Sequence, residues 1–312
     1  MRRFAQVPCL RKATAAAAAA LLTLTLTPFG VGEATAQAQF FTIGDTLARS
    51  DSTVNNAGTY LMINSPQGAS YVCSGTLITE VHVLTAKHCV HDTNTDEQIL
   101  ESATATIGLN RTAPTDTGTV STDGVDIHPT ADLAVLTLDR PVDNTTPAPV
   151  LAEEIDDNGY AVASGFGTGD GNMPLEHMGE ASIRLRGKQE FRLDGMADTT
   201  QVGYFGTPTG NDRITQGDSG GPLHDYDQVI GVNAGVERDF PFTMTFVPTQ
   251  DYAEWIESVA PGSVEGLPEA APAPAPALSG PSIPDSIPAL VASVQTGWSW
   301  CPLGPCPRWH NR

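Results

Sequence analysis

The sequence predicts an all-β architecture with one helix near its C-terminal end. Between residues 40 and 260, short segments rich in β-branched and aromatic residues alternate with Gly, Pro, Asn and Asp, as strands and turns do. The expected strands are residues 58–64, 74–79, 81–86, 104–109, 132–138, 160–167, 181–187, 228–236 and 242–248. Helical spacing is scarce until residues 248–260. The apolar residues at that spacing are Tyr252, Trp255, Ile256 and Val259. Many short strands and a single helix indicate a barrel or a sandwich.

The first 38 residues have the layout of a secretory signal peptide. Basic residues precede an apolar run at 13–26, and Ala36-Gln37-Ala38 offers a small-x-small cleavage site. Pro28 and Gly30 follow the run, which is shorter than the ~20 residues of a membrane-spanning helix. We therefore expect residues 1–38 to be removed, and the mature chain to be exported from about residue 39 without a stable membrane anchor.

The composition changes after Gly262. Residues 263–290 are rich in Pro and Ala, which is typical of an extended linker. Residues 291–312 hold three tryptophans and the pair Cys301 and Cys306. This tail is expected to be disordered. The alternatives are a small binding tip that is closed by a disulfide, and an error in the gene model. The predicted folded domain is therefore 39–262.

Charge and cysteine content limit the partners and cofactors. Residues 39–262 hold 10 Lys and Arg against 32 Asp and Glu, a net charge of −22. Such a surface repels nucleic acid, so we expect no nucleic-acid partner and interpret the acidity as a means of solubility. The chain is expected to be a monomer. After loss of Cys9 with the signal peptide, an even number of cysteines remains, which favours disulfides in an exported chain. No Cys/His group has zinc spacing, and neither a metal nor another cofactor is expected.

Three short motifs carry the candidate chemistry. "VLTAKHCV" places His88 after a strand, "ADLAVLTLD" places Asp132 before one, and "QGDSGGP" places Ser219 among glycines. A serine hydroxyl is a poor nucleophile unless a histidine takes its proton, and that histidine needs a carboxylate to orient it. The three residue types are all present, in the order His, Asp, Ser.

The stretches "TAKHC", "DLAVL" and "GDSGGP" resemble the three catalytic motifs of the chymotrypsin/trypsin-like serine proteases. The resemblance covers about residues 40–260 and includes the closing "YAEWI". It implies two six-stranded antiparallel β-barrels with a C-terminal helix and the triad in the cleft between the barrels. It also implies a disulfide between Cys73 and Cys89 that pins the histidine loop.

The resemblance implies a role for each motif residue. Ser219 is expected to attack a peptide carbonyl, His88 to transfer the proton and Asp132 to orient His88. The backbone N–H groups of Gly217 and Ser219 are expected to form the oxyanion hole. The predicted function is a secreted serine endopeptidase that acts on proteins or peptides through an acyl-enzyme. The alternative is a catalytically inactive, protease-like binding protein.

The substrate pocket departs from the family pattern. Arg213 stands six residues before Ser219, where an aspartate would select Arg or Lys, so cleavage after basic residues is not expected. Arg213 either lies in the pocket and pairs with acidic side chains, or points to solvent. The second case leaves a small apolar pocket walled by Ala234, Val236 and Met244.

Two further expectations concern activation and the other histidines. In the family, an aspartate placed like Asp218 often pairs with a new N-terminal amine. The usual Ile-Val-Gly-Gly start is absent, and the nearest candidate is Ile43-Gly44. We therefore expect a zymogen that is processed beyond signal removal. The remaining histidines of the β region that we assign to the surface are His82, His91 and His128.

Overall fold

The computed structural model describes residues 46–92, 95, 97–169, 173–192, 200–210, 212–236 and 243–268. The chain divides into one compact unit, residues 1–267, and a second of residues 268–312. The predicted signal peptide, the candidate start at Ile43 and the tail with Cys301 and Cys306 lie outside the described residues. The helices and strands of the described residues belong to the first unit.

The first sheet has seven strands in the order β7-β6-β1-β2-β3-β9-β8. They are β1 (Gly58–Asn64), β2 (Ser70–Leu77), β3 (His82–Thr85), β6 (Ser102–Ile107), β7 (Asp116–Ser121), β8 (Val125–Ile127) and β9 (Ala134–Thr137). Every pairing in this sheet is antiparallel. The alternation that predicts a half-buried strand is clear in β6, where Ala103, Ala105 and Ile107 point into the core. A separate pair, β4 (His91–Asp92) and β5 (Glu97–Gln98), lies outside this sheet.

The second sheet has eight strands, six of which close into a ring. They are β10 (Val150–Leu151), β11 (Tyr160–Gly165), β12 (Gly179–Phe191), β13 (Gln201–Pro208), β14 (Pro222–Asp225), β15 (Gln228–Val236), β16 (Met244–Pro248) and β17 (Val264–Glu265). The order β14-β11-β12-β13-β16-β15 is completed by pairing of β15 with β14. β10 and β17 extend the ring in parallel. The sheet therefore continues to Glu265, past the predicted domain end at residue 262.

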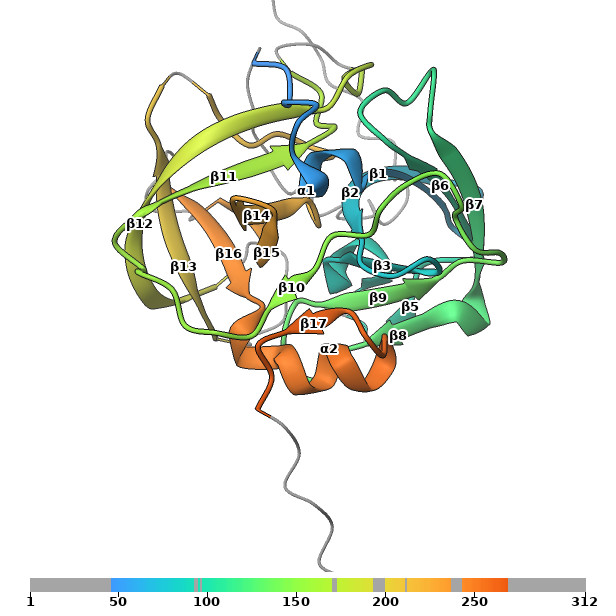
Figure 1. Ribbon diagram of the computed structural model, residues 1–312. Coiled ribbons are helices and arrows are strands. Elements are labelled where there is room, and N and C mark those ends of the chain that lie inside the picture. The colour runs from blue at the N-terminus through green and yellow to red at the C-terminus, as the bar shows by residue number, and fades with distance from the viewer. Residues whose placement is uncertain are drawn as a thin grey trace, which may run out of the picture. The chain divides into compact units, whose positions relative to one another are not determined.

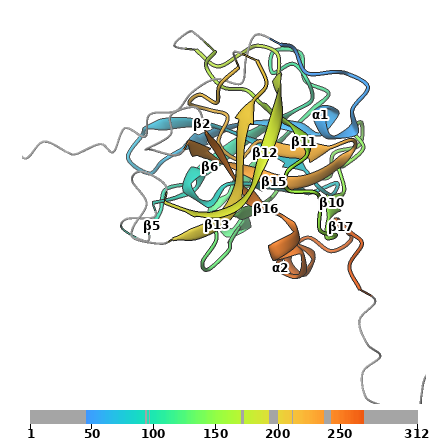
Figure 2. The ribbon, with the colours of Figure 1, turned by 90° about the vertical axis from the view of Figure 1, so that its left-hand side faces the viewer.

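The helices are short and lie outside the two sheets. They are α1 (Thr53–Asn56), η1 (Lys87–Cys89), η2 (Thr122–Gly124), η3 (Gln250–Tyr252) and α2 (Ala253–Val259). Figures 1 and 2 show α2 below the barrels, next to the last strand, β17. Ile256 is fully buried, and Trp255 and Val259 pack against the larger hydrophobic core, to which both sheets contribute. The helix predicted from the spacing of these residues is confirmed, with Tyr252 in the 3₁₀ turn before it.

The predicted fold class, an all-β chain with two barrel-like sheets and a C-terminal helix, is confirmed (Figure 1). The sheets hold seven and eight strands instead of the expected six each, and the pairings of β10 are parallel instead of antiparallel. The sequence does not predict the strands β7, β8, β13 and β14, nor the two-residue strands β4, β5, β10 and β17. The surface assignment of the histidines holds only in part, because His91 is buried, with 6% of its surface exposed. It lies in β4, two residues after Cys89, where the chain turns back toward β5.

Candidate active site

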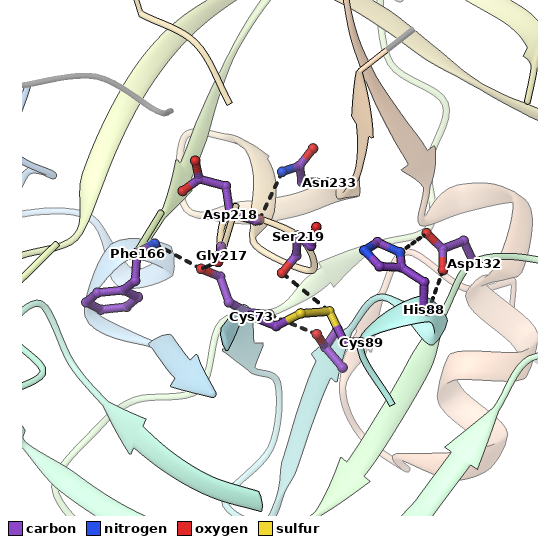
Figure 3. Close-up of a disulfide and its surroundings, with 11 residues drawn as sticks. Cys73, His88, Cys89, Asp132, Phe166, Gly217, Asp218, Ser219 and Asn233 are labelled. Carbon is purple, nitrogen blue, oxygen red and sulfur yellow. Dashed lines mark hydrogen bonds and ion pairs between the residues drawn. A yellow bond between two sulfur atoms is a disulfide. The ribbon is translucent and has the colours of Figure 1, made fainter. Parts of the chain in front are cut away.

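The histidine loop is fixed by a disulfide. His88 lies in η1, the 3₁₀ turn that follows β3 after Ala86. The next residue, Cys89, is bonded to Cys73 on β2, across a sequence separation of 16. The predicted Cys73–Cys89 disulfide is therefore present, and it ties the turn that carries His88 to the central strand of the first barrel (Figure 3).

The Asp132 carboxylate holds His88 at two points. Its Oδ1 accepts from the backbone N–H of His88 at 2.8 Å, and its Oδ2 lies 2.8 Å from Nδ1. A carboxylate only accepts, so Nδ1 carries the hydrogen and the neutral ring keeps its lone pair at Nε2. Asp132 is 1% exposed, and its own N–H donates to Oε1 of Gln201 on β13 at 3.0 Å. The second barrel thus helps to place a residue of the first.

Burial and the neighbouring charge shift the pKa of His88 in opposite directions. Burial disfavours the imidazolium, but the Asp132 carboxylate and its hydrogen bond outweigh burial, so the pKa of His88 is raised. A raised pKa makes the imidazole a stronger base than a free histidine. The arrangement therefore suits proton abstraction from a neighbouring hydroxyl.

Ser219 lies on a tight loop between the two barrels. Gly217 has φ 100°, in the left-handed region that favours glycine. A Cβ on Gly220 would lie 2.1 Å from Oγ1 of Thr85 and 2.4 Å from the carbonyl oxygen of Ser74. This second glycine lets the loop pack directly on β2, where the Ser74 N–H donates to the Ser219 carbonyl at 2.8 Å. Figure 3 shows the His88 imidazole between Ser219 and Asp132.

The side chain of Asp218 points into the protein and anchors the loop. It is fully buried. Its Oδ1 accepts from the Gly167 N–H and its Oδ2 from the Thr215 N–H, each at 2.7 Å. Two backbone amides therefore compensate for the burial of this carboxylate.

Two residues outside the three motifs also hold the loop. The Ser74 hydroxyl donates to the Gly217 carbonyl at 2.7 Å. Nδ2 of Asn233 donates to the Asp218 carbonyl at 2.9 Å (Figure 3). Sequence reasoning missed both. The available signals were the serine directly after Cys73 and the single amide inside the apolar run "VIGVNAGV".

The chain matches a known protein family over most of its folded unit. The family model for trypsin matches residues 50–256, more than half of the chain. The chain belongs to the trypsin family. This confirms the predicted resemblance and makes the chain a member of a family of protease hydrolases, for which protein or peptide substrates are expected.

Two bacterial relatives are each 29% identical in sequence to the chain. A trypsin from Saccharopolyspora erythraea is 29% identical over 202 residues, which are 59% of this chain and 83% of the relative. An uncharacterized peptidase from Corynebacterium glutamicum (strain R) is also 29% identical, over 73% of this chain and 78% of the relative.

Solved structures share the fold, and one of them is an inactivated protease. The HL collagenase structure has a TM-score of 0.54 at 20% identity and covers 69% of this chain and 96% of its own. An inactivated protease paralogue of the scabies mite has a TM-score of 0.53 at 19% identity, with coverage of 69% and 99%. Because the trypsin fold occurs without activity, the site residues must carry the functional argument.

The predicted pocket residues differ in exposure. Arg213 is exposed, whereas Ala234 and Met244 are buried and Val236 is partly buried. Among the described residues, no group of three His, Cys, Asp or Glu side chains is placed to hold a metal ion. None of the described helices is long and apolar enough to cross a membrane.

Proposed function

We propose that the chain is a secreted serine endopeptidase that hydrolyses peptide bonds through Ser219, His88 and Asp132. The observation that carries this proposal is the two-point contact of the buried Asp132 carboxylate with His88, whose ring lies between Asp132 and Ser219. Export is supported by the signal-peptide pattern of residues 1–38. The acidic composition favours a monomer without a nucleic-acid partner.

The first half of the reaction forms an acyl-enzyme. The Ser219 Oγ attacks the carbonyl carbon of the scissile peptide, and its proton moves to Nε2 of His88. Asp132 stabilises the imidazolium that forms. The N–H groups of Gly217 and Ser219 donate to the oxyanion of the tetrahedral intermediate. When the C–N bond breaks, His88 returns the proton to the leaving amine and an ester to Ser219 remains.

The second half of the reaction releases the acid. Water attacks the ester carbonyl while its proton passes to Nε2 of His88. The C–O bond to Ser219 then breaks, and His88 returns the proton to the serine oxygen. One peptide bond and one water are consumed, one carboxylic acid and one amine are formed, and the triad is restored without any cofactor.

Ser219→Ala tests the nucleophile. We expect kcat for a mixed peptide library to fall ~10⁴-fold or more, because activity that remains without the serine comes from binding and the oxyanion hole alone. The thermal unfolding temperature is expected to stay close to that of the wild type. Equal hydrolysis by wild type and variant after purification would remove Ser219 from the mechanism.

For the primary pocket we propose selection of small apolar side chains. The support is the exposure of Arg213 together with the burial of Ala234 and Met244. Cleavage profiles of wild type and Arg213→Ala on one peptide library are expected to agree. An acidic preference that disappears in the variant would instead place Arg213 in the pocket, and a strong preference for Arg or Lys would contradict both versions.

Activation remains part of the proposal, because the segment with Ile43 lies outside the described residues. N-terminal sequencing of the active protein is expected to find a start beyond the signal-peptide cleavage site. Active protein that begins at Gln39 would mean that some group other than a new N-terminal amine satisfies Asp218.

A further inference from the structure

We propose that Ser74 and Asn233 are positioning residues of the oxyanion hole. Each hydrogen-bonds one of two consecutive carbonyls in the loop that presents the Gly217 and Ser219 N–H groups. The inference rests on the proposed function of that loop. Neither residue belongs to the three sequence motifs, and neither contacts the triad side chains in any hydrogen bond of the described residues.

Asn233 acts on the peptide group that carries one of the proposed donors. Its Nδ2 donates to the Asp218 carbonyl at 2.9 Å, and the Gly221 N–H donates to the same oxygen at 3.0 Å. That carbonyl shares a planar trans peptide with the Ser219 N–H, so the two groups point in opposite directions. Because Asn233 on β15 holds the Asp218 carbonyl oxygen, the Ser219 N–H points away from β15. The two bonds also polarise the peptide and strengthen its N–H as a donor.

Ser74 acts on the preceding peptide group from the other barrel. Its hydroxyl accepts from the Phe166 N–H at 2.9 Å and donates to the Gly217 carbonyl at 2.7 Å. The single proton and one of the two lone pairs of the hydroxyl are thus engaged, which fixes its orientation. The carbonyl is held on β2 while Gly217 keeps its positive φ, so the two peptide planes that meet at Gly217 cannot rotate without breaking this bond.

The burial of Asn233 supports a role beyond packing. The side chain is fully buried, and among the described residues its Oδ1 has no hydrogen-bond partner. A desolvated acceptor is unfavourable, so an apolar residue of the same size would suit the β15 strand better. What the carboxamide adds is the Nδ2 bond to the Asp218 carbonyl. Active sites commonly keep residues that lower the stability of the fold but are needed for function, and we interpret the buried carboxamide of Asn233 in this way.

The test compares Asn233→Leu and Ser74→Ala with Thr245→Val as a matched control. Thr245 lies on the adjacent strand β16, is equally buried, and has a hydroxyl without a partner among the described residues. We expect kcat to fall about 10- to 100-fold in Asn233→Leu and Ser74→Ala with KM nearly unchanged, because a small misplacement of catalytic donors has effects of this size. Thr245→Val is expected to stay within about twofold of the wild type, and Ser74→Thr, which keeps the hydroxyl, to recover most of the loss in Ser74→Ala.

Two readouts separate positioning from a structural role. Active-site titration with a fluorophosphonate gives the fraction of competent serine, so kcat is expressed per titrated site. Amide hydrogen exchange of Gly217 and Ser219, which needs no catalysis, is expected to accelerate in Asn233→Leu but not in Thr245→Val. The thermal unfolding temperature of Asn233→Leu is expected to equal or exceed that of the wild type.

Unchanged kcat per titrated site in Asn233→Leu, with unchanged exchange at Ser219, would overturn the inference. A loss of kcat matched by loss of folded protein would do the same. If the wild type neither reacts with the fluorophosphonate nor cleaves peptides, the proposed function fails instead. In that case the exchange comparison by itself decides whether Ser74 and Asn233 hold the loop.

Discussion

Among the described residues, two histidines lie beside a serine, and only one of the two is also hydrogen-bonded to a carboxylate. His88 lies beside Ser219, with Asp132 on its far side (Figure 3). His224 on β14 is fully buried, unlike His88, whose side chain is 18% exposed, and the Nε2 of His224 lies 3.3 Å from Oγ of Ser164. The group on the far side of His224 is the neutral carbonyl of Tyr226, 3.1 Å from Nδ1.

The difference between the two far-side groups sets the chemistry. Burial lowers the pKa of His224, and the hydrogen bond to the Tyr226 carbonyl, which acts in the opposite direction, does not reverse this. For His88, burial acts in the same direction, but the Asp132 carboxylate reverses the balance and the pKa rises. In addition, Ser164 donates its only proton to Oδ1 of Asn55 at 2.8 Å, so that proton is already engaged. A serine next to a histidine is therefore not sufficient, and the carboxylate decides which pair can act.

The largest expected effect on kcat comes from replacing the carboxylate beside His88 by a neutral group, like the one beside His224. Asp132→Asn keeps the shape of the side chain but removes its charge, and the amide favours the wrong tautomer of His88. We expect kcat to fall ~10⁴-fold. The matched change in the other pair is Ser164→Ala, which is expected to leave kcat within about threefold of the wild type. Steady-state kinetics on one peptide substrate checks both, and equal losses in the two variants would contradict the distinction.

A smaller effect concerns the pH dependence of stability. Because the pKa of His224 is lowered in the folded state, the unfolded state binds a proton more readily below the ordinary histidine pKa of about 6.5. The contribution of His224 to stability is therefore complete above that pH and is lost as the pH falls through it. His224→Gln is expected to flatten the fall of unfolding free energy between pH 7 and pH 5, measured by urea denaturation. An unchanged slope would mean that other groups dominate.

The three residues of the proposed triad can be found from the sequence, whereas the residues that support them cannot, and the reason is physical. His88, Asp132 and Ser219 lie in short motifs whose residue types are dictated by the chemistry of the reaction. The Ser74 bond to the Gly217 carbonyl spans 143 residues, and nothing local in either segment requires it. Such contacts exist only once the two barrels have come together.

The missed strand β13 has a different cause. Gly203 and Gly206 interrupt its pattern as turn residues would. In the fold, however, a Cβ on Gly203 would lie 2.5 Å from the Phe246 carbonyl, and one on Gly206 would lie 2.3 Å from Ile183. These glycines make room for neighbouring strands and side chains, which a single sequence does not reveal.

The central claim is that Ser219, and not Ser164, is the activated serine. The most direct measurement is reaction of the folded protein with a fluorophosphonate, followed by peptide mapping of the modified residue. We predict stoichiometric labelling of Ser219, strong slowing of the reaction in Asp132→Asn, and no change in Ser164→Ala. Folded, N-terminally processed protein that stays unlabelled at Ser219, or that is labelled at Ser164 instead, would contradict this claim.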